Sequence, residues 1–106
     1  MGINAFTKTG NTVTFTAAAT PPTPVQVTNN TLGGNQYRII NNGSVTVFLG
    51  FSSSAATAAA NAANVATSLP LLPNTDEILT FTPNAYFTGK TTSGTAVIYV
   101  TPGDGL

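Results

Sequence analysis

Period-two alternation of apolar and polar side chains is the main pattern along this chain. In residues 12–16, Val13 and Phe15 alternate with threonines, and alternate side chains of a strand point to opposite faces of its sheet. Comparable short segments, separated by Gly, Pro, Asn and Ser, lie at 25–27, 36–40, 45–51, 76–82, 85–91 and 95–101. Short strands divided by turn residues predict an all-β fold: an antiparallel β-sandwich, jelly-roll or immunoglobulin-like, of roughly seven to eight strands.

Two dipeptides in these turns predict local hairpins. Asn42-Gly43 separates two apolar segments, and both central residues of a type I′ turn need a positive φ, which Asn and Gly adopt readily. Ser93-Gly94 occupies the same place between the last two segments. We therefore expect the segments on either side of each dipeptide to pair with each other.

Alternation also assigns core positions. One predicted core face is formed by Val45, Val47, Leu49 and Phe51, and another by Leu79 and Phe81. In the last segment one face carries Ala96, Ile98 and Val100, and the other carries Val97 and Tyr99. A strand that is apolar on both faces is usually central in its sheet or covered by a neighbour.

The stretch 52–68 is an Ala/Ser-rich insertion between strands. Alanine favours a helix and Ser54 is a suitable N-cap, but Val65 is the one large apolar residue available for packing. A short helix and an extended loop both remain open. The proline-containing segments 21–24 and 69–73 are interpreted as stiff connectors, because proline lacks the N–H that a central strand needs.

The chain has 106 residues, which is the size of one domain. We interpret 1–106 as a single β-sandwich domain with the insertion near 52–68 and arm-like termini, of which terminal Leu106 is expected to dock. Only 6% of the residues are charged and the net charge is zero. Such a chain has little electrostatic protection against association, so we expect it to live in an assembly.

The same charge pattern argues against two classes of partner. Nucleic acids and anionic membranes both require several Lys or Arg on one face, and this chain has three basic residues, Lys8, Arg38 and Lys90. The N-terminus has no signal-peptide pattern, and no stretch reaches the roughly 18 apolar residues that cross a bilayer.

Residues for catalysis are scarce. The chain contains no His, Cys or Trp, so the usual zinc and copper ligands and a His-activated serine are excluded. Asp76 and Glu77 are adjacent on a strand and therefore point to opposite faces, which does not suit general acid/base catalysis. Asp104 with either of them lacks the spacing of a calcium loop. We predict no catalytic, cofactor-binding or metal-binding residues, and no enzyme.

Other candidate motifs have simpler structural explanations. Gly33-Gly34-Asn35 is a turn rather than a phosphate loop, and the glycosylation patterns at 29–31 and 42–44 are explained by Asn-rich turns. Tyr37, Tyr86, Phe87 and Tyr99 would make a sugar-stacking platform if they shared one face. The alternative is that these rings fill the core or an oligomer interface.

Three segments resemble small proteins encoded in tailed-phage virion gene clusters: YRIINNGSVTVFLGFSSSAATA from Tyr37, LPLLPNTDEILTFTPNAYFTG from Leu69, and SGTAVIYVTPGDGL from Ser93. The last segment is the most diagnostic. The chain is similar to capsid decoration, or cement, proteins, which are jelly-roll or immunoglobulin-like sandwiches without a catalytic motif. The resemblance implies a virion structural protein on the capsid exterior, made in the host cytoplasm.

This resemblance sets the functional expectation. The expected partners are the major capsid protein lattice and further copies of the chain, as a homodimer or homotrimer, with no nucleic acid and no membrane. The alternative is a tail- or fibre-associated module that binds a host-surface glycan.

Overall fold

The computed structural model describes residues 7–28 and 36–104, the side chain of Asp104 excepted. The predicted turn at 33–35, the acceptor pattern at 29–31, the N-terminal arm up to residue 6 and the expected docking of Leu106 lie outside these residues. Within them are nine strands: β1 (Thr7–Lys8), β2 (Val13–Ala17), β3 (Val25–Gln26), β4 (Gln36–Asn41), β5 (Val47–Ser52), β6 (Leu69–Leu71), β7 (Thr75–Thr80), β8 (Tyr86–Lys90) and β9 (Ala96–Asp104).

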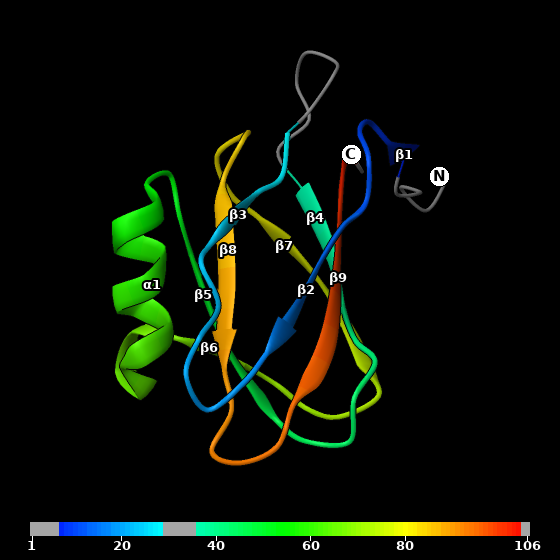
Figure 1. Cartoon of the computed structure of the whole chain (residues 1–106). Coiled ribbons are helices and arrows are strands. Elements are labelled where there is room, and N and C mark those ends of the chain that lie inside the picture. Colours follow the sequence, from blue (N-terminus) through cyan, green and yellow to red (C-terminus); the bar gives the residue numbers. More distant parts are fainter. Residues whose placement is uncertain (1–6, 29–35, 105–106) are drawn as a thin grey trace.

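The strands form two antiparallel sheets packed face to face (Figure 1). In the β9 sheet, β1 and β2 both pair with one side of β9, followed by β4 and β7; the β8 sheet has the order β3-β8-β5-β6. The predicted all-β sandwich is therefore confirmed. Its topology is that of a jelly roll, because β2, β3, β4 and β5 pair with β9, β8, β7 and β6 respectively.

Both predicted hairpins are wrong. Strand β4 lies in the β9 sheet and β5 in the β8 sheet, and the same separation holds for β8 and β9. The Asn42-Gly43 turn crosses between the sheets, and neither residue has a positive φ. Instead, the N–H of Asn42 donates to the carbonyl of Val97, and Gly43 is needed because a Cβ there would overlap the Cβ of Ala96.

The segment 69–73 is only partly a connector, because its first three residues form β6 at the edge of the β8 sheet. Pro70 lies opposite Phe48 of β5. An edge strand tolerates proline, since the missing N–H can face away from the sheet. The connector interpretation failed because it considered only central strands, from which proline is excluded, and not an edge strand.

The core lies between the two sheets and follows the predicted faces. Fully buried side chains include Val47 and Leu49 of the β8 sheet and Ile98 of the β9 sheet, with Leu79 and Phe81 packed at the margin. Tyr37 and Phe87 meet edge to face across the core, with ring centroids 4.9 Å apart. Strand β9 is central, as its two apolar faces predicted.

The Ala-rich insertion forms helix α1 (Ala55–Ala63), followed by a 3₁₀ turn, η1 (Val65–Thr67). Ser54 caps the helix, because its side chain accepts a hydrogen bond from the N–H of Thr57. The helix covers the outer face of the β8 sheet (Figure 1). Small residues make this contact: Ala58 and Ala62 are buried against Gly50, where an added Cβ would lie 2.7 Å from the Cβ of Ala62.

Candidate binding face

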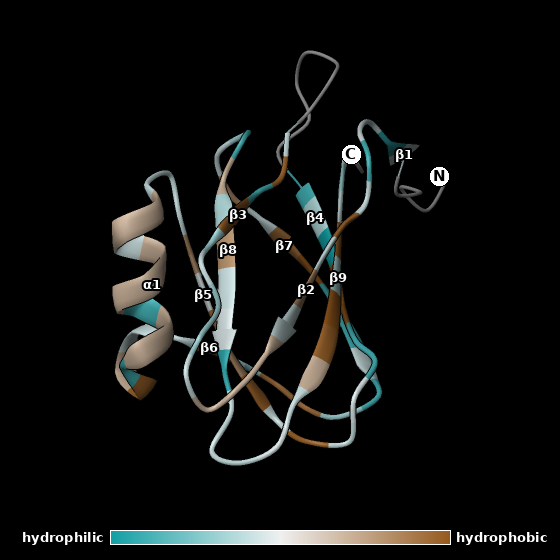
Figure 2. Ribbon diagram, in the orientation of Figure 1, coloured by the Kyte–Doolittle hydropathy of each residue, from teal (hydrophilic) through white to brown (hydrophobic). Residues whose placement is uncertain are grey.

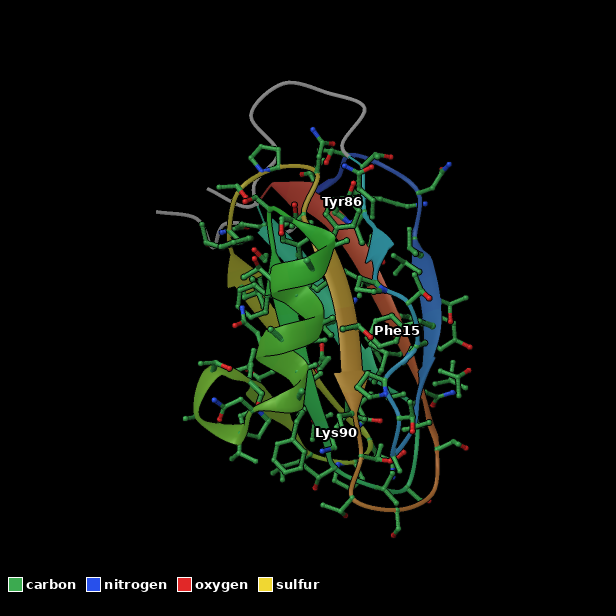
Figure 3. All side chains as sticks on the ribbon, turned by 60° about the vertical axis from the view of Figure 1, so that its left-hand side comes forward. Phe15, Tyr86 and Lys90 are labelled. Carbon is green, nitrogen blue, oxygen red and sulfur yellow. The ribbon has the colours of Figure 1, made fainter. Side chains whose placement is uncertain are left out.

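The two outer surfaces of the sandwich differ in one respect: α1 covers the β8 sheet, and no described helix covers the β9 sheet (Figure 1). Figure 3 shows Tyr86 and Lys90 at the two ends of β8, with α1 running alongside the strand. We call the uncovered surface of the β9 sheet the open face. Strand register gives its outward side chains as Lys8, Thr14, Thr16, Gln36, Arg38, Ile40, Asp76, Ile78, Thr80, Val97, Tyr99 and Thr101.

Strand register places these side chains in rows across the open face. One row runs Thr14, Tyr99, Ile40, Asp76, and the next runs Thr101, Arg38, Ile78. Each row therefore carries apolar and hydroxyl groups side by side. Figure 2 shows the hydrophobic stretch of β9, the strand at the centre of this sheet. Tyr99 is 37% exposed and Ile78 is 53% exposed, so both remain available to a partner.

The open face carries few charges, and two of them form an ion pair. The guanidinium of Arg38 donates to the same Oδ2 atom of Asp76 from Nη2 at 3.1 Å and from Nε at 3.2 Å. An ion pair this exposed adds little stability. Within the pair the two charges cancel, and the one further charge that the register places on this face is Lys8, which lies at its end opposite Gly103.

Two shallow, polar depressions lie at one end of the open face. The first, of about 220 Å³, is bordered by the Arg38–Asp76 pair and Ile40. The second, of about 400 Å³, is bordered by Ser44, Thr95 and Val97, among others. Asn42 and Asn74 border both of them, so the depressions adjoin. This end of the face is therefore an open, amide-rich rim and not an enclosed cavity.

The structure does not bring the carboxylates of Asp76 and Glu77 together, and the side chain of Asp104 lies outside the described part of the chain. Asp76 lies on the open face, whereas Glu77 lies on the opposite side of β7, level with Ile39. In the described part of the chain, no three Asp, Glu, His or Cys residues group as a metal site would require. The hydroxyls of Ser52 and Ser54 accept hydrogen bonds from backbone N–H groups at the start of α1, so both have structural roles.

The four rings of the hypothetical sugar platform do not share a face. Tyr37 and Phe87 are fully buried, Tyr86 is half-buried at the start of β8, and Tyr99 is on the open face. Burial raises the pKa of Tyr37 above its ordinary value, although the N–H of Ala85 donates to its hydroxyl and opposes the shift. The Tyr37 hydroxyl donates in turn to the carbonyl of Thr82.

Sequence reasoning identified Val97 and Tyr99 as a second apolar face but missed Ile40 and Ile78. The signal was present, because alternation places Ile78 opposite in direction to the core residue Leu79. What the sequence did not reveal was which outer sheet surface α1 would leave bare.

Comparisons with known proteins give little further information. No family model matches the chain, and no curated protein matches it. A solved structure described as "Bacillus endospore appendages form a novel family of disulfide-linked pili" is similar over 99% of this chain and 92% of that chain, with 14% identity and a TM-score of 0.44. A likeness this distant carries no argument about function. No helix in 7–28 or 36–104 has the length and apolar character needed to cross a membrane.

Proposed function

We propose that this chain is a structural protein of a tailed-phage virion, which decorates and stabilises the capsid by binding the major capsid protein lattice through the open face. The observation that carries the proposal is the contrast between the two outer surfaces: one is covered by α1, and the other is bare, sparsely charged and partly apolar. The sequence resemblance to capsid decoration proteins supports the same function. The proposal includes no catalytic step.

The chemistry of the open face suits docking onto a protein surface. Tyr99 and Ile78 offer apolar area, and the threonines of β2 and β9 offer hydroxyls that pair without the desolvation cost of a charge. Tyrosine is also enriched in interface centres. Because the face carries one ion pair and one further charge at its end, Lys8, binding should depend only weakly on salt.

The size of the open face limits the affinity of one copy. Four strands of about five residues cover roughly 320 Å² of flat sheet. A standard stable interface takes about 800 Å² from each partner. A single copy should therefore bind weakly, and contacts between neighbouring copies, in a homodimer or homotrimer, should supply the remainder.

The first experiment measures copy number. Purified phage particles are analysed by quantitative mass spectrometry, and a cryo-electron microscopy reconstruction locates the density. A shell protein is expected in a fixed ratio to the major capsid protein over the whole capsid exterior. A handful of copies per particle, or density confined to the tail, would contradict the proposal and favour a tail-associated binding module.

The second experiment tests the open face with a matched pair of variants. Tyr99→Lys places a charge in the middle of the face and is expected to weaken binding to capsids that lack the protein by about tenfold or more. Val65→Lys makes the same kind of change at an exposed apolar residue of η1, outside the face, and should bind as the wild type does. Equal binding by the two variants would exclude the open face as the docking surface.

A further inference from the structure

Strand β7 has a free edge. It pairs with β4 on one side, and no strand of the described chain pairs with it on the other. The backbone N–H and C=O groups along such an edge are a template for a further strand. An exposed edge of this kind is a natural site of strand addition.

The other sheet edges are protected. In the β8 sheet, β3 is two residues long and follows Pro24, and β6 is three residues long with Pro70 at its centre. At the far side of the β9 sheet, Ala18 follows β2 and bridges to Lys90 of β8, so the two sheets approach each other there. By contrast, β7 has six residues, Thr75–Thr80, without Pro or Lys.

We propose that β7 pairs antiparallel with β7 of a second copy, about a two-fold axis perpendicular to the β9 sheet. This axis keeps both open faces on one side, as two copies bound to the same surface require, so the choice of axis rests on the proposed function. The contact is isologous, because each copy contributes the same strand. It joins the two β9 sheets into one continuous sheet.

Charge selects the register of this pair. A perpendicular axis sets residues of the same face opposite each other. Registers centred on Asp76 or Glu77 place like charges directly opposite, which is destabilising. The register centred on Ile78 instead places the half-exposed Ile78 side chains against each other and sets Asp76 opposite Thr80 of the second copy.

Glu77 limits the strength of the pair. It lies on the core side of β7, and in this register it is opposite Leu79 of the second copy. A charge that points inward from an edge strand opposes edge-to-edge pairing, because its carboxylate loses water. The dimer is therefore weak in dilute solution and forms at the high local concentration that a decorated surface provides.

Single-cysteine variants test the register, since the chain has no native cysteine. Ile78→Cys brings two thiols together on the axis and is expected to give a disulfide-linked dimer on mild oxidation of concentrated protein. Thr14→Cys, exposed on β2, is the matched control and should remain monomeric. A mixture of Asp76→Cys and Thr80→Cys should cross-link to each other faster than either does to itself.

Analytical ultracentrifugation of the free protein measures the affinity. Glu77→Gln is expected to lower the dimer dissociation constant severalfold, Ile78→Lys to abolish the dimer, and Tyr99→Lys to leave it unchanged. If Ile78→Cys cross-links no faster than Thr14→Cys and Glu77→Gln stays monomeric, the pairing is overturned. No capsid is present in these experiments, so failure here and failure of capsid decoration are read separately.

Discussion

Asn41 is the polar residue on which a connection between the two sheets depends. Its side chain is fully buried, donates to the carbonyls of Val45 and Leu71, and accepts from the N–H of Gly43. One amide thus satisfies three backbone groups, two in the turn between β4 and β5 and one in β6. Burial without those bonds would cost stability for every group left unpaired.

Asn41→Ala should therefore destabilise the protein strongly. Each buried group left without a partner costs about 1–3 kcal/mol, so we expect a loss of roughly 3 kcal/mol or more in the free energy of unfolding. Urea denaturation measures it. Asn42→Ala, at the exposed neighbouring amide, should stay within about 0.5 kcal/mol of wild type. Similar losses in the two variants would refute the role assigned to Asn41.

Tyr37 makes the free energy of unfolding depend on pH in the alkaline range. Its pKa is raised in the folded state by desolvation, so below pH 10.0, the ordinary value, the phenol is neutral in both the folded and unfolded states. Above that pH the unfolded state loses the proton first and is stabilised, so the free energy of unfolding falls as pH rises towards the folded pKa.

Tyr37→Phe should remove this component of the alkaline destabilisation. The variant is also less stable at neutral pH, because the N–H of Ala85 and the carbonyl of Thr82 lose their partner. Guanidinium denaturation between pH 8 and 11.5 tests both expectations. Tyr99→Phe, on the open face, should keep the wild-type slope; an unchanged slope in Tyr37→Phe would exclude Tyr37 as its source.

At the scale of elements, α1 depends on close approach rather than on large apolar side chains. Gly50 lets the helix backbone reach the sheet, since a Cβ at this position would overlap the carbonyl O of Ala58 and the amide N of Ala62. The Ala-rich sequence therefore acts in two ways: alanine favours the helix, and its small side chain allows the helix backbone to lie close to the sheet.

Gly50→Ala should displace α1 and destabilise the fold. Overpacking against a rigid backbone costs about 1–3 kcal/mol, measured by thermal or urea unfolding. Ala60→Ser, on the exposed side of the same helix, is expected to change stability by less than about 0.5 kcal/mol. Wild-type stability in Gly50→Ala would show that the helix is not held this closely.

The elements also show what could be predicted from the sequence. Alternation gave the faces of Val13, Phe15 and the final strand, because the side-chain period of a strand is local. The pairing of the strands could not be predicted in this way, because paired strands are far apart in the sequence. The Asn42-Gly43 dipeptide favoured a hairpin, but the buried Asn41 network and the contact of Gly43 with Ala96 determine the turn. The open face could not be predicted, because it depends on where α1 packs.

At the scale of the whole molecule, every jelly-roll pair joins the first half of the chain to the second, up to β2 with β9. Such non-local topology requires large loops to close before contacts form, so we expect folding in milliseconds to seconds, roughly, rather than microseconds. Stopped-flow refolding by tyrosine fluorescence measures the rate. Complete refolding within the mixing dead time would contradict the dominance of these long-range pairs.

The helix on one side of the sandwich also determines how many broad sheet surfaces the molecule leaves open for binding. If the open face is the docking surface that we propose, each copy has a single broad surface for adhesion, because α1 covers the other sheet. Molecules held to a support by that surface present α1 outward, and the exposed side of α1 consists of small alanine and threonine side chains. A coat built from such units stops after one layer, so its thickness is fixed by the unit itself.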